Sequence, residues 1–128
     1  MRKVHARAPD FKVRFYKPGD EVGIVNLLQN TFPKWAMINN SLNFWKWKYT
    51  DAPYGREILV AVINEIIIGV EHSIFLPLKI NDKNLTANFS GDTATHPDYR
   101  GIGVYSRIMN LQDQNRKNLY GIFVLFIK

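Results

Sequence analysis

Hydrophobic and polar positions alternate over Val13–Tyr16, and this alternation predicts a β-strand near the start of the chain. The turn sequence Lys17–Asp20 follows and supplies a carboxylate that can cap a helix. Apolar residues then recur at helical spacing over residues 21–30, which predicts a helix that Pro33 ends. The chain therefore begins with a strand that leads into a helix.

A second helix is predicted after Ser41, because apolar residues lie three and four positions apart until the turn sequence Asp51–Gly55. These residues are Leu42, Trp45 and Tyr49. The same segment contains an aromatic cluster that consists of Phe44, Trp45, Trp47 and Tyr49. We expect this aromatic cluster to pack against the core rather than to form a platform on which nucleic-acid bases stack.

Two runs rich in β-branched residues, Glu57–Ile63 and Ile66–Leu76, are separated only by Asn64–Glu65. A two-residue connection is the length of a tight β-hairpin, so the two runs are expected to be antiparallel neighbours. After a turn at Asn81–Asn84, the segment Leu85–Thr95 is expected to add a third antiparallel strand. The middle of the chain is thus predicted to be a β-meander.

Helical spacing returns from about Gly103 to Lys117, and the last segment, Tyr120–Ile127, is almost continuously apolar. Such a run is typical of a strand buried on both faces, often beside a parallel neighbour. The order β-α-α-β-β-β-α-β predicts an α/β fold with a mixed, mostly antiparallel twisted sheet and flanking helices. Because a terminal apolar strand has unpaired backbone groups at its edge, we expect a longer natural chain or a homodimer formed through this strand.

The 128 residues, 46% of them hydrophobic, suffice for one domain and are too few for two separate cores. We assign residues 1–12 to a basic, flexible N-terminal segment and residues 13–128 to the domain. No apolar stretch is long enough to span a membrane, and no secretory signal precedes the domain, so a cytoplasmic location is expected.

The chain has no cysteine, which excludes disulfides, thiolate nucleophiles and cysteine-ligated zinc. Its three histidines show no metal-ligand spacing, so no metal site is expected. A net charge of +6 suits an anionic partner such as nucleic acid or a phosphorylated cofactor. A duplex-binding protein usually has its Lys and Arg side chains clustered on one helix, whereas here they are spread along the chain, which disfavours nucleic acid.

A glycine-containing turn after Thr95 leads from a predicted strand into a predicted helix. Gly101 and Gly103 have no Cβ, so backbone N–H groups in this turn can approach a ligand closely, and the first amides of the helix add positive potential. Arg100 adds a fixed positive charge, and together these donors favour a pyrophosphate. A dinucleotide fingerprint is excluded because Ser106 replaces its third glycine, and a P-loop is excluded because no Lys-Ser/Thr pair follows the glycines.

The sequence of residues 100–105, Arg-Gly-Ile-Gly-Val-Tyr, resembles the Arg/Gln-x-x-Gly-x-Gly/Ala signature of the GNAT acyl-CoA N-acyltransferase superfamily. As in that family, the signature follows the fourth strand. The resemblance implies acetyl-CoA as co-substrate, held at its pyrophosphate by the turn and along its pantetheine arm by the end of the strand. The residues implied in this binding are Thr93, Ala94, Thr95, Arg100, Gly101, Ile102, Gly103, Val104 and Tyr105.

The sequence departs from the family pattern at two places. Tyr105 stands where the signature has a small residue, so its ring is expected to point into the core or against the cofactor. The family core also continues with a further helix and β-hairpin, and that helix often carries a tyrosine proposed to protonate the leaving thiolate. No such elements follow Lys128, so a short, incomplete domain is one interpretation.

Acyl transfer to an amine requires a neutral amine, so a carboxylate or an ordered water should accept a proton near the acetyl group. Asp92 is the first candidate, either as base or as an anchor for the acceptor, because it directly precedes the strand end. We expect Ser90 to share its side of the strand. Glu71 is the second candidate because it interrupts an apolar strand beside Ser73. On the predicted third helix, Arg107 is a candidate contact for the adenine-side phosphate.

These observations predict an N-acetyltransferase that moves the acetyl group of acetyl-CoA directly to a primary amine. The alternatives are a non-catalytic or incomplete CoA-binding module, and a basic nucleic-acid-binding domain. The identity of the acceptor does not follow from the sequence.

Overall fold

The computed structural model describes residues 10–120 and 124–127, and the side chains up to residue 117. Five strands form one sheet in the order β1-β2-β3-β4-β5. The strands are β1 (Lys12–Phe15), β2 (Arg56–Ile63), β3 (Ile66–Ile80), β4 (Lys83–Thr95) and β5 (Val124–Ile127). Neighbours from β1 to β4 are antiparallel, and β5 is parallel to β4. The predicted mixed, mostly antiparallel sheet is therefore confirmed, as is the parallel neighbour of the last strand.

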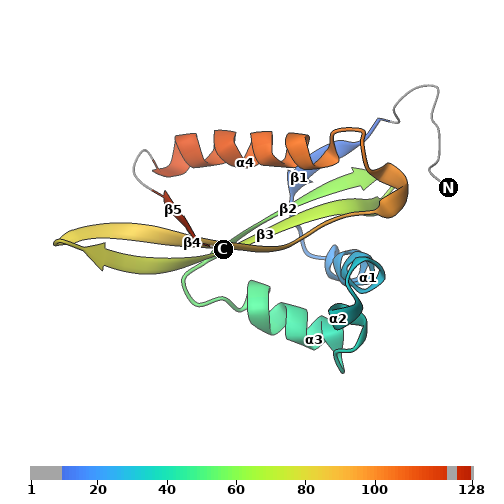
Figure 1. Ribbon diagram of the computed structural model, residues 1–128, viewed down its shortest axis with the longest axis horizontal. Helices are drawn as coiled ribbons and strands as arrows, with labels where there is room; N and C mark the ends of the chain where they lie inside the picture. Colours follow the sequence, from blue (N-terminus) through green and yellow to red (C-terminus); the bar gives the residue numbers. More distant parts are fainter. Residues whose placement is uncertain (1–9, 121–123, 128) are drawn as a thin grey trace.

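The helices cover both faces of the sheet (Figure 1). One face carries α1 (Glu21–Thr31), α2 (Pro33–Ala36), α3 (Ser41–Trp45) and a π-helical turn, η1 (Lys46–Thr50). The other face carries α4 (Val104–Tyr120), which is reached from β4 through a short 3-10 turn, η2 (Pro97–Tyr99). None of the helices in the described part of the chain is long and apolar enough to cross a membrane.

Both hairpin connections use residues in the left-handed region. Asn64 and Glu65 have φ values of 47° and 66°, and Asn81 and Asp82 have values of 49° and 66°. Left-handed backbone at both central residues is the requirement of a type I′ turn, whose twist matches that of the flanking strands. The first hairpin is where the sequence predicts it. The second turn is shorter than predicted, so β3 and β4 are longer and extend as an arm beyond the helices (Figure 1).

Each face of the sheet has its own apolar core. On the side of α1–α3, the core contains Ile24, Leu28 and Trp45, all fully buried. On the side of α4, Val104 packs against β2 and β3. A Cβ atom placed on Gly69 of β3 would lie 2.6 Å from Cγ1 of Val104. Glycine at this position therefore permits the start of α4 to approach the sheet closely.

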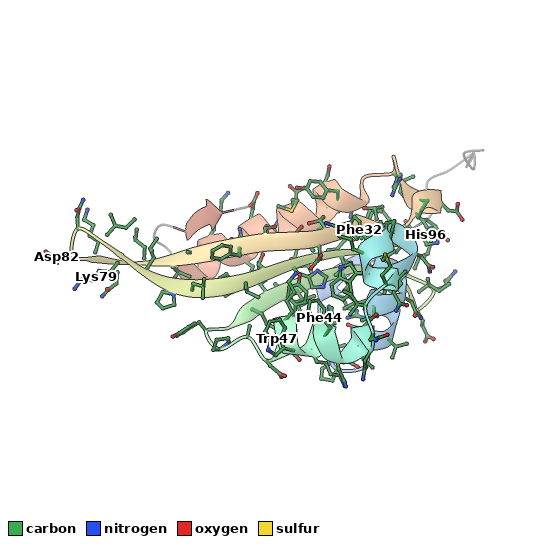
Figure 2. The ribbon with its side chains drawn as sticks, turned by 60° about the horizontal axis from the view of Figure 1, so that its bottom comes forward. Phe32, Phe44, Trp47, Lys79, Asp82 and His96 are labelled. Carbon is green, nitrogen blue, oxygen red and sulfur yellow. The ribbon has the colours of Figure 1, made fainter. Side chains whose placement is uncertain are left out.

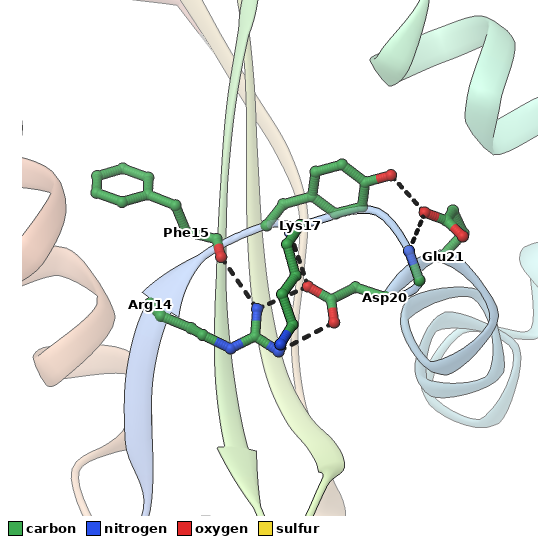
Figure 3. Close-up of polar contacts among 7 residues, drawn as sticks. Arg14, Phe15, Lys17, Asp20 and Glu21 are labelled. Atoms are coloured by element: carbon green, nitrogen blue, oxygen red, sulfur yellow. Dashed lines mark hydrogen bonds and ion pairs between the residues drawn. The ribbon is translucent and has the colours of Figure 1, made fainter.

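The junction between β1 and α1 is fixed by two carboxylates (Figure 3). Arg14 donates two hydrogen bonds to Asp20, at 2.7 and 3.0 Å, and the backbone N–H of Lys17 donates a third at 2.9 Å. The sequence predicts that Asp20 caps α1, but its side chain makes no capping hydrogen bond to the helix. Burial alone would raise the pKa of Asp20, but the Arg14 hydrogen bonds outweigh it and the pKa is lowered.

The second of these carboxylates is Glu21, which accepts hydrogen bonds from the Tyr16 hydroxyl and the Gly19 backbone N–H (Figure 3). Burial and the hydrogen bond to Glu21 raise the pKa of Tyr16 to about 12. Hydrogen bonds to these two carboxylates therefore hold the end of β1 against the first turn of α1.

Two expectations need correction. Residues 11 and 12 belong to the folded body, because Phe11 is buried and Lys12 opens β1, whereas residues 1–9 lie outside the described part. Pro33 opens α2, a helix that the sequence pattern does not predict, because the first turn of a helix tolerates proline. Arg107 is exposed on α4, donates to the Phe11 carbonyl at 2.9 Å and has its guanidinium 4.1 Å from the Phe11 ring centroid, and its contact with the adenine-side phosphate stays a prediction.

Candidate functional site

An open hollow of about 440 Å³ lies where β4 leads into α4. Its lining consists of Thr95, Arg100, Gly101, Gly103, Val104, Tyr105 and Ser106. Six of these seven residues are in the set that the GNAT resemblance assigns to cofactor binding. The Tyr105 ring is 50% exposed, so it borders the hollow instead of entering the core.

The two glycines of the turn are needed for its path. Gly101 and Gly103 have φ values of 83° and 89°, a region that residues with a Cβ rarely adopt. Directly after Gly103 the helix α4 begins, and the Arg107 N–H donates its hydrogen bond to the Gly103 carbonyl at 3.0 Å. The earlier N–H groups of the helix start have no helical acceptor, so they and Arg100 form a positive wall suited to an anion.

The strand edge that leads to this hollow is paired on one side. Among the described residues, β5 pairs with β4 only from Thr86 to Phe89. From Ser90 to Thr95, β4 pairs with β3 and has no strand on its other edge in the part of the chain that the structure describes. An open strand edge can bind an extended amide-containing chain through backbone hydrogen bonds.

A β-bulge interrupts β4 within this open edge. Val70 of β3 pairs with Ala94, but His72 pairs with Gly91, so Asp92 and Thr93 lie together opposite Glu71. Asp92 has a φ of 47°. A bulge of this kind turns neighbouring side chains to different faces. The expectation that Ser90 and Asp92 share one side of the strand is therefore wrong: Ser90 donates to Glu71, and Asp92 accepts from residues of the opposite face.

Asp92 points to the face covered by α1–α3, where three donors hold its carboxylate. The Trp35 indole donates at 3.1 Å, Lys48 at 2.9 Å, and the Tyr49 hydroxyl donates a short hydrogen bond. Burial alone would raise the pKa of Asp92, but these three hydrogen bonds and the Lys48 charge outweigh it and lower the pKa. Burial and the bond to Asp92 raise the pKa of Tyr49. Asp92 is therefore ionised and Tyr49 neutral near neutral pH.

His72 contacts the bulge through its imidazole ring. Its ring is fully buried, stacks on Tyr49 with a centroid distance of 4.1 Å, and has Nδ1 3.0 Å from the backbone oxygen of Asp92. Burial lowers the pKa of His72 to about 4, so the ring is neutral.

Glu71 points to the face covered by α4 and is 1% exposed. It accepts short hydrogen bonds from the hydroxyls of Ser90, which precedes the bulge, and Thr93, which belongs to it. Asp92 and Glu71, the two carboxylates selected from the sequence, thus lie at the same bulge but on opposite faces of the sheet.

Trp35 and Lys48 also belong to this site, although no sequence pattern predicts a functional role for either. Trp35 is on the unpredicted α2, and Lys48 is on the π-helical turn η1.

The predicted aromatic cluster packs against the core only in part. Trp45 and Tyr49 are in the core, as expected, while Trp47 is 67% exposed. Within the described residues, no group of three or more potential ligands is arranged to hold a metal ion.

Comparisons with known proteins agree on the fold. A family model described as an acetyltransferase (GNAT) domain matches residues 12–125. A transcriptional regulator from Bacillus halodurans superposes with a TM-score of 0.72 at 18% identity, covering 93% of this chain and 81% of that one. An acetyltransferase from Trypanosoma brucei superposes with a TM-score of 0.71 at 18% identity, covering 93% and 83%.

A predicted acetyltransferase from Clostridium acetobutylicum, whose structure contains acetyl-CoA, superposes with a TM-score of 0.69 at 13% identity, covering 93% of this chain and 81% of that one. At such identities, structural likeness shows a shared fold and no more. The sequence search of curated proteins found no match.

Proposed function

The chain belongs to the acetyltransferase (GNAT) domain family and is a GNAT-type N-acyltransferase, and from this premise we propose that it transfers the acetyl group of acetyl-CoA directly to a primary amine. The observation that carries the proposal is the continuous path from the open edge of β4 to the glycine turn at the start of α4. A strand edge and a positively polarised helix start are the two surfaces that an amide-containing arm and a pyrophosphate require.

The residues present fit such a co-substrate. We assign the pyrophosphate to the turn, with the backbone amides of residues 102–105 as donors and Arg100 beside them. The pantetheine arm is assigned to the backbone of Thr93, Ala94 and Thr95, and a backbone amide of this strand polarises the acetyl carbonyl. When bound, acetyl-CoA supplies the activated acetyl group.

The two carboxylates are assigned different roles. The lowered pKa of Asp92 makes it a weak base but a permanent negative charge, so we assign it to anchoring the ammonium group of the acceptor. Glu71 is assigned as the proton acceptor, reached through the hydroxyl of Thr93, which already donates to it. Because Thr93 and Glu71 lie on the opposite face of β4 from Asp92, the anchored ammonium must leave Asp92 and reach the Thr93 hydroxyl at the open strand edge. There Thr93 passes its proton to Glu71 and takes one from the ammonium, and the amine attacks in its neutral form.

The absence of cysteine gives the proposal a direct assay. Because the chain contains no thiol of its own, any free thiol that appears with acetyl-CoA comes from released CoA. We expect acetyl-CoA to raise the melting temperature and a panel of primary amines to include at least one that accelerates thiol release. No melting shift together with salt-dependent DNA binding would reject the proposal in favour of a nucleic-acid-binding domain. A melting shift without amine-dependent release would indicate a non-catalytic CoA-binding module.

A further inference from the structure

The ammonium group of Lys48 lies on Asp92, at the carboxylate to which the proposed function assigns the acceptor's ammonium group. Its Nζ is 2.9 Å from Oδ2 of Asp92. The other two donors to this carboxylate, Trp35 and Tyr49, are 4% and 2% exposed and belong to the core. The Lys48 side chain is 38% exposed, so it is the partner of Asp92 that can leave towards solvent without disrupting packing.

Resting on the proposed function, we infer that Lys48 is an internal stand-in for the acceptor: the acceptor is an alkylammonium compound that displaces Lys48 from Asp92. While the site is empty, Lys48 supplies the positive charge that the partly buried Asp92 carboxylate needs. When the acceptor's ammonium arrives, one cation replaces another and the charge balance at Asp92 is kept.

This exchange makes Lys48 a specificity determinant. A neutral ligand of the same shape would have to remove the Lys48 ammonium without replacing its charge, and would leave the Asp92 carboxylate without a cation. A cationic ligand avoids that cost. The apparent affinity for the acceptor is then the intrinsic affinity multiplied by the fraction of time that Lys48 is away from Asp92.

An aromatic row beside Asp92 provides a surface for the apolar part of such a ligand. The ring of Phe44 is 5.4 Å from that of Trp35, which donates to Asp92, and 5.8 Å from that of Trp47. Phe44 and Trp47 lie next to each other on the α3–η1 segment (Figure 2). The row therefore runs from the buried donor to Asp92 through the half-buried Phe44 to the exposed Trp47. The rings of Phe44 and Trp47 are the part that a ligand can reach, and such rings contact both alkyl chains and ammonium groups favourably.

The inference can be tested without acetyl-CoA. The chain has three tryptophans, so an ¹H-¹⁵N spectrum contains three indole signals, and Trp35→Phe identifies the one from the donor to Asp92. We would titrate the protein with n-butylammonium chloride and with 1-butanol. Lys48→Met keeps the long apolar stem and removes the charge, while Lys48→Arg keeps a cation and serves as the matched control. The folded state of each variant is checked by its melting temperature.

We expect butylammonium to move the Trp35 indole signal, butanol to leave it unchanged, and Lys48→Met to bind butylammonium about tenfold more tightly than the wild type. Lys48→Arg should bind as weakly as the wild type. Equal affinities in wild type and Lys48→Met, or an equal response to butanol, overturn the inference. If Lys48→Met is unfolded, Lys48→Gln replaces it in the same comparison. Because no CoA is present, these results are separate from acetyl-CoA binding, whose failure would overturn the proposed function instead.

Discussion

The indole N–H of Trp45 donates a hydrogen bond to Nε2 of His72 at 2.9 Å. An indole nitrogen is a donor only, so Nε2 of His72 must be the acceptor and the proton of the neutral ring is on Nδ1. Nδ1 in turn donates to the backbone oxygen of Asp92. The ring thus links α3 to the bulge of β4, and both of its nitrogens are satisfied only while it is neutral.

This arrangement predicts a loss of stability in mild acid. The pKa of His72 is lowered from 6.5 to about 4 in the folded chain, so between these values the unfolded chain binds more protons than the folded one. The contribution of the neutral His72 ring to the free energy of unfolding is present in full above pH 6.5 and is lost as the pH falls towards 4. The free energy of unfolding should decrease by about 3 kcal/mol over this window. Urea denaturation at several pH values between 7 and 4 measures it.

The control is His72→Gln, whose amide can also accept from Trp45 and donate to Asp92 without titrating. The free energy of unfolding of this variant should change clearly less between pH 7 and pH 4 than that of the wild type. The lowered pKa values of Asp92, Asp20 and Glu21 also reduce the free energy of unfolding as the pH falls towards their ordinary values of 3.8 and 4.5, but these groups are the same in both proteins and their effect cancels in the comparison. An unchanged pH dependence in His72→Gln would assign the acid sensitivity to other groups.

A second prediction concerns the contact between β3 and α4. Gly69→Ala would place a Cβ 2.6 Å from Val104 and 3.3 Å from Ala61, so the helix or the strand must shift. We expect a loss of about 1–3 kcal/mol in the free energy of unfolding. Since Val104 opens the helix that follows the glycine turn, acetyl-CoA binding should weaken as well. Chemical denaturation and calorimetry measure the two effects.

Gly91→Ala is the matched control, because a Cβ at that position meets nothing within 4 Å. Its free energy of unfolding should change by no more than about 0.5 kcal/mol. If both glycine substitutions cost the same, the loss reflects backbone properties of glycine and not the contact with Val104.

Most of the fold follows from local sequence signals. The Asn64–Glu65 connection and the β-branched runs around it predict the hairpin, because turn length and strand propensity are local properties. The helix α2 is not predicted, since four residues are too short to show a periodicity. The π-helical turn η1 likewise has no sequence signature.

The site was only partly predictable for a different reason. The glycine turn after Thr95 has a local signature, and the hollow lies at that turn. The bulge at Asp92 depends on how β4 pairs with β3, and such an irregularity is not encoded by one strand alone. Trp35 and Lys48 converge on Asp92 from distant parts of the chain, which only tertiary packing brings about.

The division of roles between the two carboxylates predicts distinct kinetics with an amine that proves to be an acceptor. Glu71→Gln should lower kcat about a hundredfold with little change in the KM of the amine, because it removes a proton acceptor. Asp92→Asn should mainly raise that KM, because it removes the anchor of the ammonium group. Thiol release at saturating acetyl-CoA measures both constants. The same kinetic change in both variants would contradict separate roles and indicate a shared structural effect at the bulge.

The last prediction tests the charge beside the glycine turn. Arg100 is exposed and lines the hollow, so Arg100→Ala should leave the melting temperature nearly unchanged. A charge-assisted contact contributes about 1.5–3 kcal/mol, so the dissociation constant of acetyl-CoA should rise by about tenfold to a hundredfold in calorimetry. Lys117→Ala, which removes an exposed positive charge near the other end of α4, should change it little. If both variants weaken binding equally, the net positive charge attracts the ligand and Arg100 has no specific role. If neither does, the pyrophosphate does not bind at this turn.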